Sequence, residues 1–179
     1  MANLPIKRVI FFALILSVIY LASPKLFHTY LVVKEPFFID PLPLKDGIAM
    51  RSDSMGNGEY GARRSGGRRK HKGVDLEGDV GEVVVASLSG FATTGEVKRG
   101  MGKYVKILHR DGYQTVYGHL LSVSAKNESW VWQGHEIGAV GKTGNANYKR
   151  MKPHVHFEIK KNEICEDPLP YLNKEVRVK

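Results

Sequence analysis

Histidine occurs in three short clusters, two of which also contain a carboxylate, and these residue types can bind metals or move protons. The clusters are HKGVD at residues 71–75, YGH at residues 117–119 and HVHFE at residues 154–158. Imidazole and carboxylate groups are suitable ligands for Zn²⁺, and a catalytic zinc typically takes three protein ligands and leaves one position for water. Taken alone, each cluster is a weak signal, because a single histidine in a strand is more often an ordinary half-buried residue. By that standard His28, His109 and His135 stay unassigned.

The spacing inside the last cluster predicts which side chains share a face. In a β-strand, side chains two residues apart point the same way, so His154 and His156 should lie on one face. The alternate residues Val155, Phe157 and Ile159 should point into the core. The two imidazoles are therefore expected to be held on one side of a packed strand.

The first cluster can converge on one point. His71 and Asp75 are separated by an even number of residues, and Gly73 between them permits a bend, so both side chains can meet from a strand end or a turn. Glu158 shares the face of the two histidines of HVHFE by alternation. It could orient an imidazole as a hydrogen-bond acceptor, and an exposed or structural carboxylate is an equal alternative.

The elements that must position these side chains are short β runs broken by glycine. From residue 47 onward the runs are GEVVVAS, GFATTGEV, KYVKILHR, YQTVYGHL, EIGAVG and HVHFEIKK. This pattern, with 19 glycines in 179 residues, predicts an all-β fold in one globular domain. Asp111-Gly112 between two of the runs is a type I′ turn signal, so these runs should pair antiparallel. Lys161-Asn162 is a second candidate turn at the end of the last run.

An apolar N-terminal segment precedes this domain. Lys7 and Arg8 come before an uncharged run of 14 residues at 9–22, the pattern of a signal sequence with a basic n-region. No small-x-small cleavage site follows the run, which favours an uncleaved anchor helix, whereas 14 residues fall short of the ~20 that a spanning helix needs. Either way, the residues after Lys25 should be exported. The predicted location is the periplasm or cell envelope, with the chain either membrane-anchored by residues 9–22 or secreted after cleavage.

Proline marks the stretch between this segment and the domain. Four of the eight prolines fall between the apolar run and Gly47, which predicts an extended spacer rather than a helix or central strand. The predicted division is a signal peptide or membrane anchor at 1–23, a proline-rich spacer at 24–46, the β domain at 47–172 and a C-terminal tail at 173–179. Cys165 is the only cysteine, so an intramolecular disulfide is impossible.

The chain is basic, with a formal net charge of +9. Such a charge favours anionic partners, among them nucleic acid, acidic lipid surfaces and anionic cell-wall polymers. Its densest run is RRSGGRRKHK at residues 63–72, which contains His71. A run of this kind is usually a solvated loop, and its position makes substrate contact an equal alternative. Nucleic-acid binding by the run would leave the histidine clusters unexplained, so no nucleic acid is expected as a partner.

Together, the ordered motifs H-x-G-V-D, Y-G-H and H-V-H-F-E resemble the M23 family of zinc metallopeptidases, the lysostaphin/LytM type. The resemblance covers residues 47–172 and extends to the framework segments GYQTVYGHL, GHEIGAVGKTGNA and DPLPYL. It implies a compact antiparallel β-sheet domain with a substrate groove. In that domain His71, Asp75 and His156 would bind Zn²⁺, and His119 and His154 would be catalytic histidines outside the metal shell.

The resemblance also implies a mechanism. Bound Zn²⁺ lowers the pKa of water and polarises the scissile carbonyl. His154 would act as general base, and His119 would donate toward the developing oxyanion. The segment between Thr143 and His154 is a few residues longer than the usual family version and carries three cationic residues.

The implied function is a zinc-dependent endopeptidase that cleaves peptide bonds in bacterial peptidoglycan stems or cross-bridges. The implied partners are peptidoglycan and, through the N-terminal segment, the cytoplasmic membrane; a regulatory protein partner stays open. Some M23-like domains have lost metal ligands and serve as binding or activator proteins for other cell-wall hydrolases, which is the alternative function. None of the five site positions is lost here, which favours catalysis.

Overall fold

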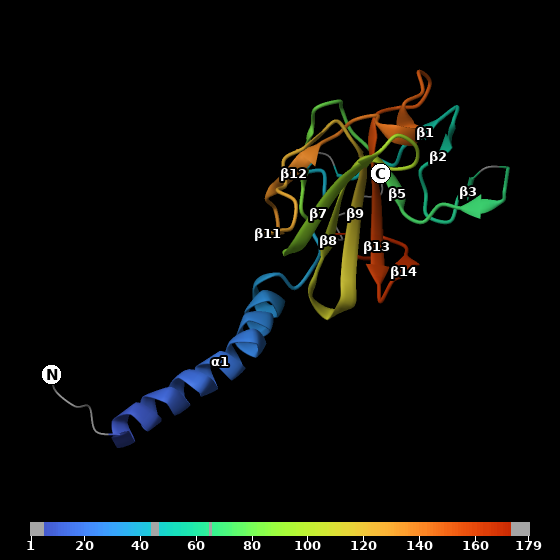
Figure 1. Cartoon of the computed structure of the whole chain (residues 1–179). Helices are drawn as coiled ribbons and strands as arrows, with labels where there is room; N and C mark the ends of the chain where they lie inside the picture. Colours follow the sequence, from blue (N-terminus) through green and yellow to red (C-terminus); the bar gives the residue numbers. More distant parts are fainter. Residues whose placement is uncertain (1–5, 44–46, 65, 173–179) are drawn as a thin grey trace. The chain divides into compact units, whose positions relative to one another are not determined.

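The computed structural model describes residues 6–43, 47–64 and 66–172. The chain divides after Pro36 into two compact units. The first contains α1 (Ile6–Lys34), which includes the predicted anchor, and the second contains the β-strands (Figure 1). Within the described ranges, no helix combines the length and the apolar character needed to cross a membrane. The predicted C-terminal tail lies outside the described residues.

The structure differs from the extended spacer predicted for residues 24–46. Pro24 lies inside α1, because a helix can continue past a proline at the cost of one hydrogen bond. After Pro36, Phe38 and Leu42 are buried in the core of the second unit. These apolar side chains pack against strands that are distant in sequence, which local proline content does not reveal. The compact β unit therefore begins at Phe37 and not near Gly47.

The second unit is antiparallel throughout its described strand pairs, as the predicted all-β fold requires. Its largest sheet has the order β11-β7-β8-β9-β13-β14, and β5 pairs with β13 (Figure 1). The strands of this sheet are β5 (Val74–Glu77), β7 (Gly90–Val97), β8 (Gly102–Leu108), β9 (Tyr113–Leu120), β11 (Ser129–Val131), β13 (His154–Lys161) and β14 (Ile164–Glu166).

Smaller sheets complete the unit. A three-stranded sheet has the order β10-β12-β6, formed by β6 (Val83–Val85), β10 (Ser122–Val123) and β12 (Glu136–Ala139). Two short hairpins precede β5 in the chain: β1 (Ser52–Asp53) with β2 (Gly56–Asn57), and β3 (Arg63–Arg64) with β4 (Arg69–Lys70). Two 3-10 turns are η1 (Arg110–Gly112) and η2 (Gly144–Ala146).

Both predicted hairpins form. Asp111 and Gly112 have φ values of 57° and 73°, and they join β8 to its antiparallel partner β9. Positive φ at both central residues is what a two-residue hairpin turn requires. The second hairpin joins β13 to β14 through Asn162 and Glu163, one residue later than the predicted turn, and both have positive φ.

Strand β13 contributes one face to the core and carries His154 and His156 on the other. It pairs with β9 along one edge and with β5 and then β14 along the other, so its main chain is enclosed on both sides. Val155, Phe157 and Ile159 are fully buried in the hydrophobic core, as the alternation predicts. The opposite face of β13 carries its two histidines. A strand fixed in this way holds those imidazoles with little freedom.

Candidate metal centre

Two paired strands and one bend bring three potential metal ligands together. Asp75 on β5 and His156 on β13 are direct partners in the strand register. His71 lies before β5, and the chain between the two ligands passes so close to β13 that a side chain at Gly73 would meet the Phe157 carbonyl oxygen at 2.2 Å. The ligand atoms of His71, Asp75 and His156 all lie within 4.8 Å of one another, and all three residues are buried.

Hydrogen bonds fix which atom each ligand offers. The Nδ1 atom of His71 lies 2.8 Å from the Glu59 carbonyl oxygen, which only accepts, so Nδ1 carries the proton and Nε2 is left to bind a metal. His156 Nε2 donates to Glu158 Oε1 at 3.1 Å and leaves Nδ1 as the ligand. Glu158 is thus the buried acceptor that orients this imidazole. Two imidazole nitrogens and one carboxylate oxygen fit a catalytic zinc, whose ligands are usually oriented by such outer partners.

The remaining oxygen of Asp75 is held by two arginines. Arg51 places Nη2 at 3.0 Å and Nε at 3.3 Å from Asp75 Oδ2, and Arg64 Nη2 lies 3.1 Å from the same oxygen. Asp75 Oδ1 faces the two histidines, at 3.1 Å from His71 Nε2 and 3.0 Å from His156 Nδ1. The carboxylate therefore has one oxygen for the arginines and one for a metal.

Sequence reasoning missed this pair of arginines. Arg51 is 2% exposed and also pairs with Asp53 at 2.7 Å, yet it belongs to no motif of the sequence. Arg64 belongs to the basic run but gives no local sign that it contacts a carboxylate on β5. Arg51 reaches Asp75 because its own N–H donates to the Asp75 carbonyl at 2.9 Å, and Arg64 reaches it from β3.

The two other predicted site histidines border the same pocket. The ring centroids of His119 and His154 lie 5.0 Å apart. His119 Nδ1 lies 2.9 Å from the Thr143 carbonyl oxygen and His154 Nδ1 lies 2.8 Å from the Lys152 carbonyl oxygen. A carbonyl oxygen can only accept a hydrogen bond, so each neutral ring carries its hydrogen on Nδ1 and has an unprotonated Nε2. Each ring can therefore accept a proton at Nε2.

His119 also has an unusual backbone. Its φ of 63° is in the left-handed region, which costs a non-glycine residue about 1–3 kcal/mol and persists only where surrounding structure enforces it. At this position the His119 N–H donates to the Met101 carbonyl at 2.7 Å, next to an irregularity in the β8–β9 register. This backbone accompanies the placement of the ring in the pocket rather than in the regular alternation of β9.

The electrostatics separate a charged ligand pair from two neutral histidines. Burial lowers the pKa of His156, but hydrogen bonds to Asp75 and Glu158 outweigh it and raise that pKa to about 9. Burial raises the pKa of Asp75, but hydrogen bonds from His156 and His71 hold it well below its usual range. Burial, reinforced by the nearby His154 and His156, lowers the pKa of His119 to about 3. Burial also lowers the pKa of His154.

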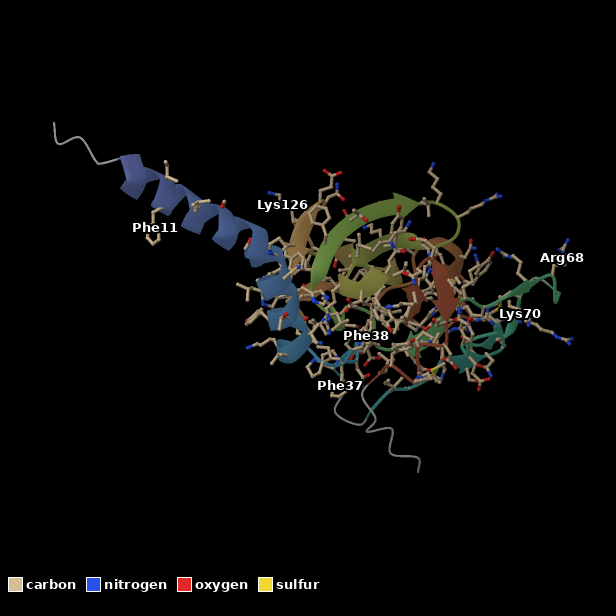
Figure 2. The ribbon with its side chains drawn as sticks, turned by 90° about the horizontal axis from the view of Figure 1, so that it is seen from below. Phe11, Phe37, Phe38, Arg68, Lys70 and Lys126 are labelled. Carbon is tan, nitrogen blue, oxygen red and sulfur yellow. The ribbon has the colours of Figure 1, made fainter. Side chains whose placement is uncertain are left out.

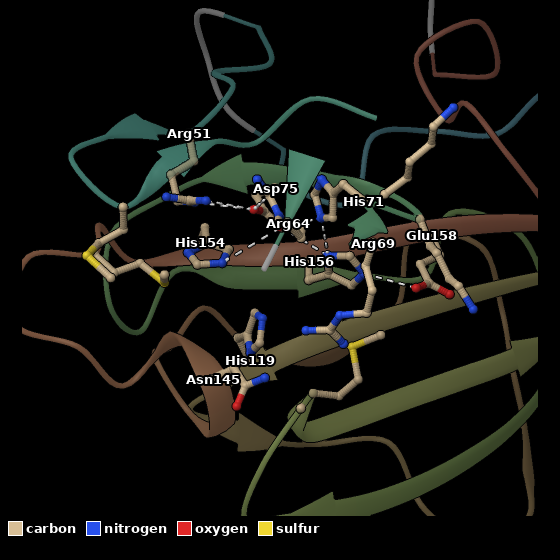
Figure 3. A pocket seen from close by; sticks show the side chains of 16 residues that line it. Arg51, Arg64, Arg69, His71, Asp75, His119, Asn145, His154, His156 and Glu158 are labelled. Atoms are coloured by element: carbon tan, nitrogen blue, oxygen red, sulfur yellow. Dashed lines mark hydrogen bonds and ion pairs between the residues drawn. The ribbon is translucent and has the colours of Figure 1, made fainter. Parts of the chain in front are cut away.

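All five predicted site residues line one pocket of about 640 Å³ (Figure 3). Their partners Arg51, Arg64 and Glu158 line it too. The three histidines left unassigned in the sequence are not among its lining residues. His109 instead makes buried hydrogen bonds to the Ser89 carbonyl and to Thr115 in the core.

Comparison with known proteins identifies the family of this arrangement. The model of peptidase family M23 matches residues 69–168, which contain all five histidine and aspartate positions. The chain belongs to family M23. The M23 domain accordingly includes the ligand triad, the two additional histidines and most of the large sheet.

Individual relatives cover part of the chain. Stage II sporulation protein Q of Bacillus subtilis is 38% identical over 107 residues, which are 59% of this chain and 37% of that protein. Murein hydrolase activator NlpD of Escherichia coli is 30% identical over 114 residues, 63% of this chain and 28% of that protein. The chain thus spans about a third of the length of these curated relatives. The catalytic domain of the antimicrobial peptidase lysostaphin from Staphylococcus simulans has a TM-score of 0.54 and 30% identity, over 63% of this chain and 87% of that one.

Proposed function

We propose that the M23 domain is a zinc-dependent endopeptidase that cleaves peptide bonds in bacterial peptidoglycan. The observation that carries the proposal is the ligand set of His71 Nε2, Asp75 Oδ1 and His156 Nδ1, whose orientation is fixed by hydrogen bonds, beside two histidines with proton-accepting Nε2 atoms. A Zn²⁺ ion held there supplies a Lewis acid that polarises the scissile carbonyl and acidifies water.

The residues of this chain supply the proton chemistry. His154 Nε2, which is unprotonated because Nδ1 donates to the Lys152 carbonyl, takes the proton of the attacking water. It then gives that proton to the leaving amine, so the peptide C–N bond breaks and the ring returns to its neutral form. The lowered pKa of His154 keeps the ring neutral, and so available as a base, before water binds.

His119 can stabilise the oxyanion only if its ring carries a hydrogen on the atom that faces the pocket, Nε2. Its Nδ1 hydrogen is engaged with the Thr143 carbonyl, so the ring donates into the pocket only after Nε2 gains a proton. The neutral ring can gain that hydrogen by changing tautomer, which moves its one proton from Nδ1 to Nε2 and breaks the hydrogen bond to the Thr143 carbonyl without an outside proton donor. We therefore assign His119 to the oxyanion as a neutral Nε2–H donor.

Localisation belongs to the same proposal. We place the M23 domain in the cell envelope, with residues 9–22 of α1 as the membrane attachment or signal segment and peptidoglycan as the partner. The relatives include an outer membrane antigenic lipoprotein of Haemophilus influenzae, whose name fits an envelope location.

A second candidate is a non-hydrolytic activator of another cell-wall hydrolase. One observation favours it: a relative that is 30% identical over 63% of this chain is named a murein hydrolase activator. Its requirement is that the domain binds peptidoglycan or a hydrolase and cuts nothing.

One experiment separates the two candidates. Purified chain is incubated with peptidoglycan, with and without a chelator, and soluble products are identified by mass. The peptidase proposal expects new amine and carboxylate ends that disappear with chelator and in the His154→Ala variant. An intact wall in every sample, together with chelator-insensitive stimulation of an added murein hydrolase, would replace the peptidase with the activator.

A further inference from the structure

The lining of the pocket is unequal in charge. Its cations come mainly from one short stretch, the β3–β4 hairpin and the residues after it: Arg64, Arg69, Lys70 and Lys72, here called the cationic wall. Met55, Met101, Met151 and Asn145, which come from other segments, contribute uncharged lining. In Figure 3 the Arg69 side chain points from β4 into the pocket. One side of a bound substrate would thus meet cations.

The carboxylates of the pocket neutralise only part of this wall, because among its members Arg64 pairs with Asp75. Asp75 is engaged by Arg51, Arg64 and two histidines. Glu158 accepts from His156 and lies 3.6 Å from Lys160. Among the described residues, no carboxylate forms an ion pair with Lys70 or Lys72. A surplus of cations in a partly enclosed pocket attracts an anion, and the attraction is stronger there than on an open surface.

We propose that the cationic wall is a subsite for a free carboxylate of the peptide substrate. The proposal rests on the peptidase function above and adds a substrate class: peptides that carry a carboxylate close to the scissile bond. The ammonium groups of Lys70 and Lys72 supply point charges for such a carboxylate, and the guanidinium of Arg69 adds positive charge to the same wall. The methionine-lined part of the pocket suits a small uncharged side chain on the other part of the peptide.

The size and place of the wall favour a peptide over a long polyanion. The cations line the same pocket of about 640 Å³ as the metal ligands, a volume that suits a small ligand or a few residues of a peptide. A carboxylate bound there would also orient the scissile carbonyl relative to His154, because both belong to one short molecule.

The test uses two synthetic peptides of one stem-peptide sequence, one with a free carboxylate beside the scissile bond and one with a carboxamide in its place. The zinc-loaded full chain should cleave the carboxylate peptide with about tenfold higher kcat/KM, the discrimination given by one hydrogen bond between charged groups. The preference should shrink as salt is raised, because added ions screen the wall. Dissociation constants for both peptides are also measured in chelator, where no cleavage occurs.

Variants locate the preference. Lys70→Gln, Lys72→Gln and Arg69→Gln should each move the carboxylate-to-carboxamide ratio toward one. Arg68→Gln is the matched control. Arg68 lies between β3 and β4 (Figure 2) and does not line the pocket, so this substitution removes the same charge from the same hairpin at a position outside the pocket. It should keep the ratio of the unchanged chain.

The outcomes separate this proposal from the peptidase function. Equal cleavage and equal binding of both peptides would overturn the subsite and leave the peptidase intact. Absence of cleavage with a binding preference that Lys70→Gln and Lys72→Gln abolish would overturn the peptidase and support the subsite. A wall variant that weakens binding of an added polyphosphate while the peptide ratio stays unchanged would assign the wall to a polyanion and refute the proposal.

Discussion

Zinc binding should expel a proton from His156. In the metal-free protein the pKa of His156 is about 9, so at pH 7 the ring is ~99% protonated, and Nδ1 and Nε2 both carry hydrogen. A metal can bind Nδ1 only after that hydrogen leaves, so about one proton should be released for each zinc bound. Removing it at pH 7 costs about 2.7 kcal/mol, from two pH units at about 1.36 kcal/mol each. Zinc affinity should therefore rise about tenfold between pH 7 and pH 8.

The assay is titration calorimetry with zinc in two buffers of different ionisation heat, from which the number of released protons follows. Glu158→Gln is the matched variant, because it removes the carboxylate that helps to raise the pKa of His156 while keeping an acceptor for Nε2. At pH 8 this variant should release fewer protons for each zinc than the unchanged chain. Any proton lost from zinc-bound water adds the same amount to both values. If zinc binds at pH 7 and releases less than about half a proton, His156 does not carry the extra proton in the metal-free protein.

The same shift has a consequence for stability in chelator. A histidine whose pKa is raised from 6.5 to about 9 by folding stabilises the folded state fully below pH 6.5, and this contribution is lost as the pH rises through 9. The 2.5 pH units correspond to about 3 kcal/mol. Urea unfolding of the metal-free protein should therefore show a lower unfolding free energy at pH 9.5 than at pH 6.5. An unchanged value would mean that His156 does not hold its proton in the folded protein.

Three further predictions follow from particular side chains. His156→Ala should lose zinc, activity and thermal stability together, whereas His154→Ala should retain zinc and lose turnover by about 10²- to 10⁴-fold. If both variants lose zinc equally, the assignment of ligand and base is wrong. Arg51→Met should lower the unfolding free energy by about 1–3 kcal/mol in chelator, because Asp53 and Asp75 both lose a charged hydrogen-bond donor while Asp75 keeps Arg64; an unchanged unfolding free energy would show that Arg51 is dispensable. Phe38→Ala should cost about 3–5 kcal/mol in urea unfolding, whereas Phe37→Ala, at a side chain 70% exposed, should change little; similar values would mean that residues after Pro36 are not part of the core.

Sequence patterns with a local physical cause predicted much of the fold. Asp111-Gly112 has residues that tolerate positive φ, so the β8–β9 hairpin could be placed without any tertiary information. The alternation in HVHFE fixed which side chains of β13 face the core, because the period of a strand is two residues. The ordered motifs together predicted the M23 family, which the family model over residues 69–168 confirms.

Other features depended on contacts between distant segments. The proline content of residues 24–46 predicted a spacer, but Phe38 and Leu42 are buried because the rest of the core offers them an apolar surface. The basic run predicted a solvated loop or a substrate contact with equal weight, and nothing in it indicated that Arg64 would reach Asp75.

The sequence by itself determined the residue types of the proposed ligand set, because imidazole and carboxylate groups suit zinc and the chain carries them in the order of the motifs. It could not determine the state of those groups. The pKa of His156, the proton on Nδ1 of His119 and the arginines on Asp75 depend on burial and on hydrogen-bond partners that are distant in sequence. Electrostatic free energies are set by distance and by exclusion of water, and only the folded chain fixes both.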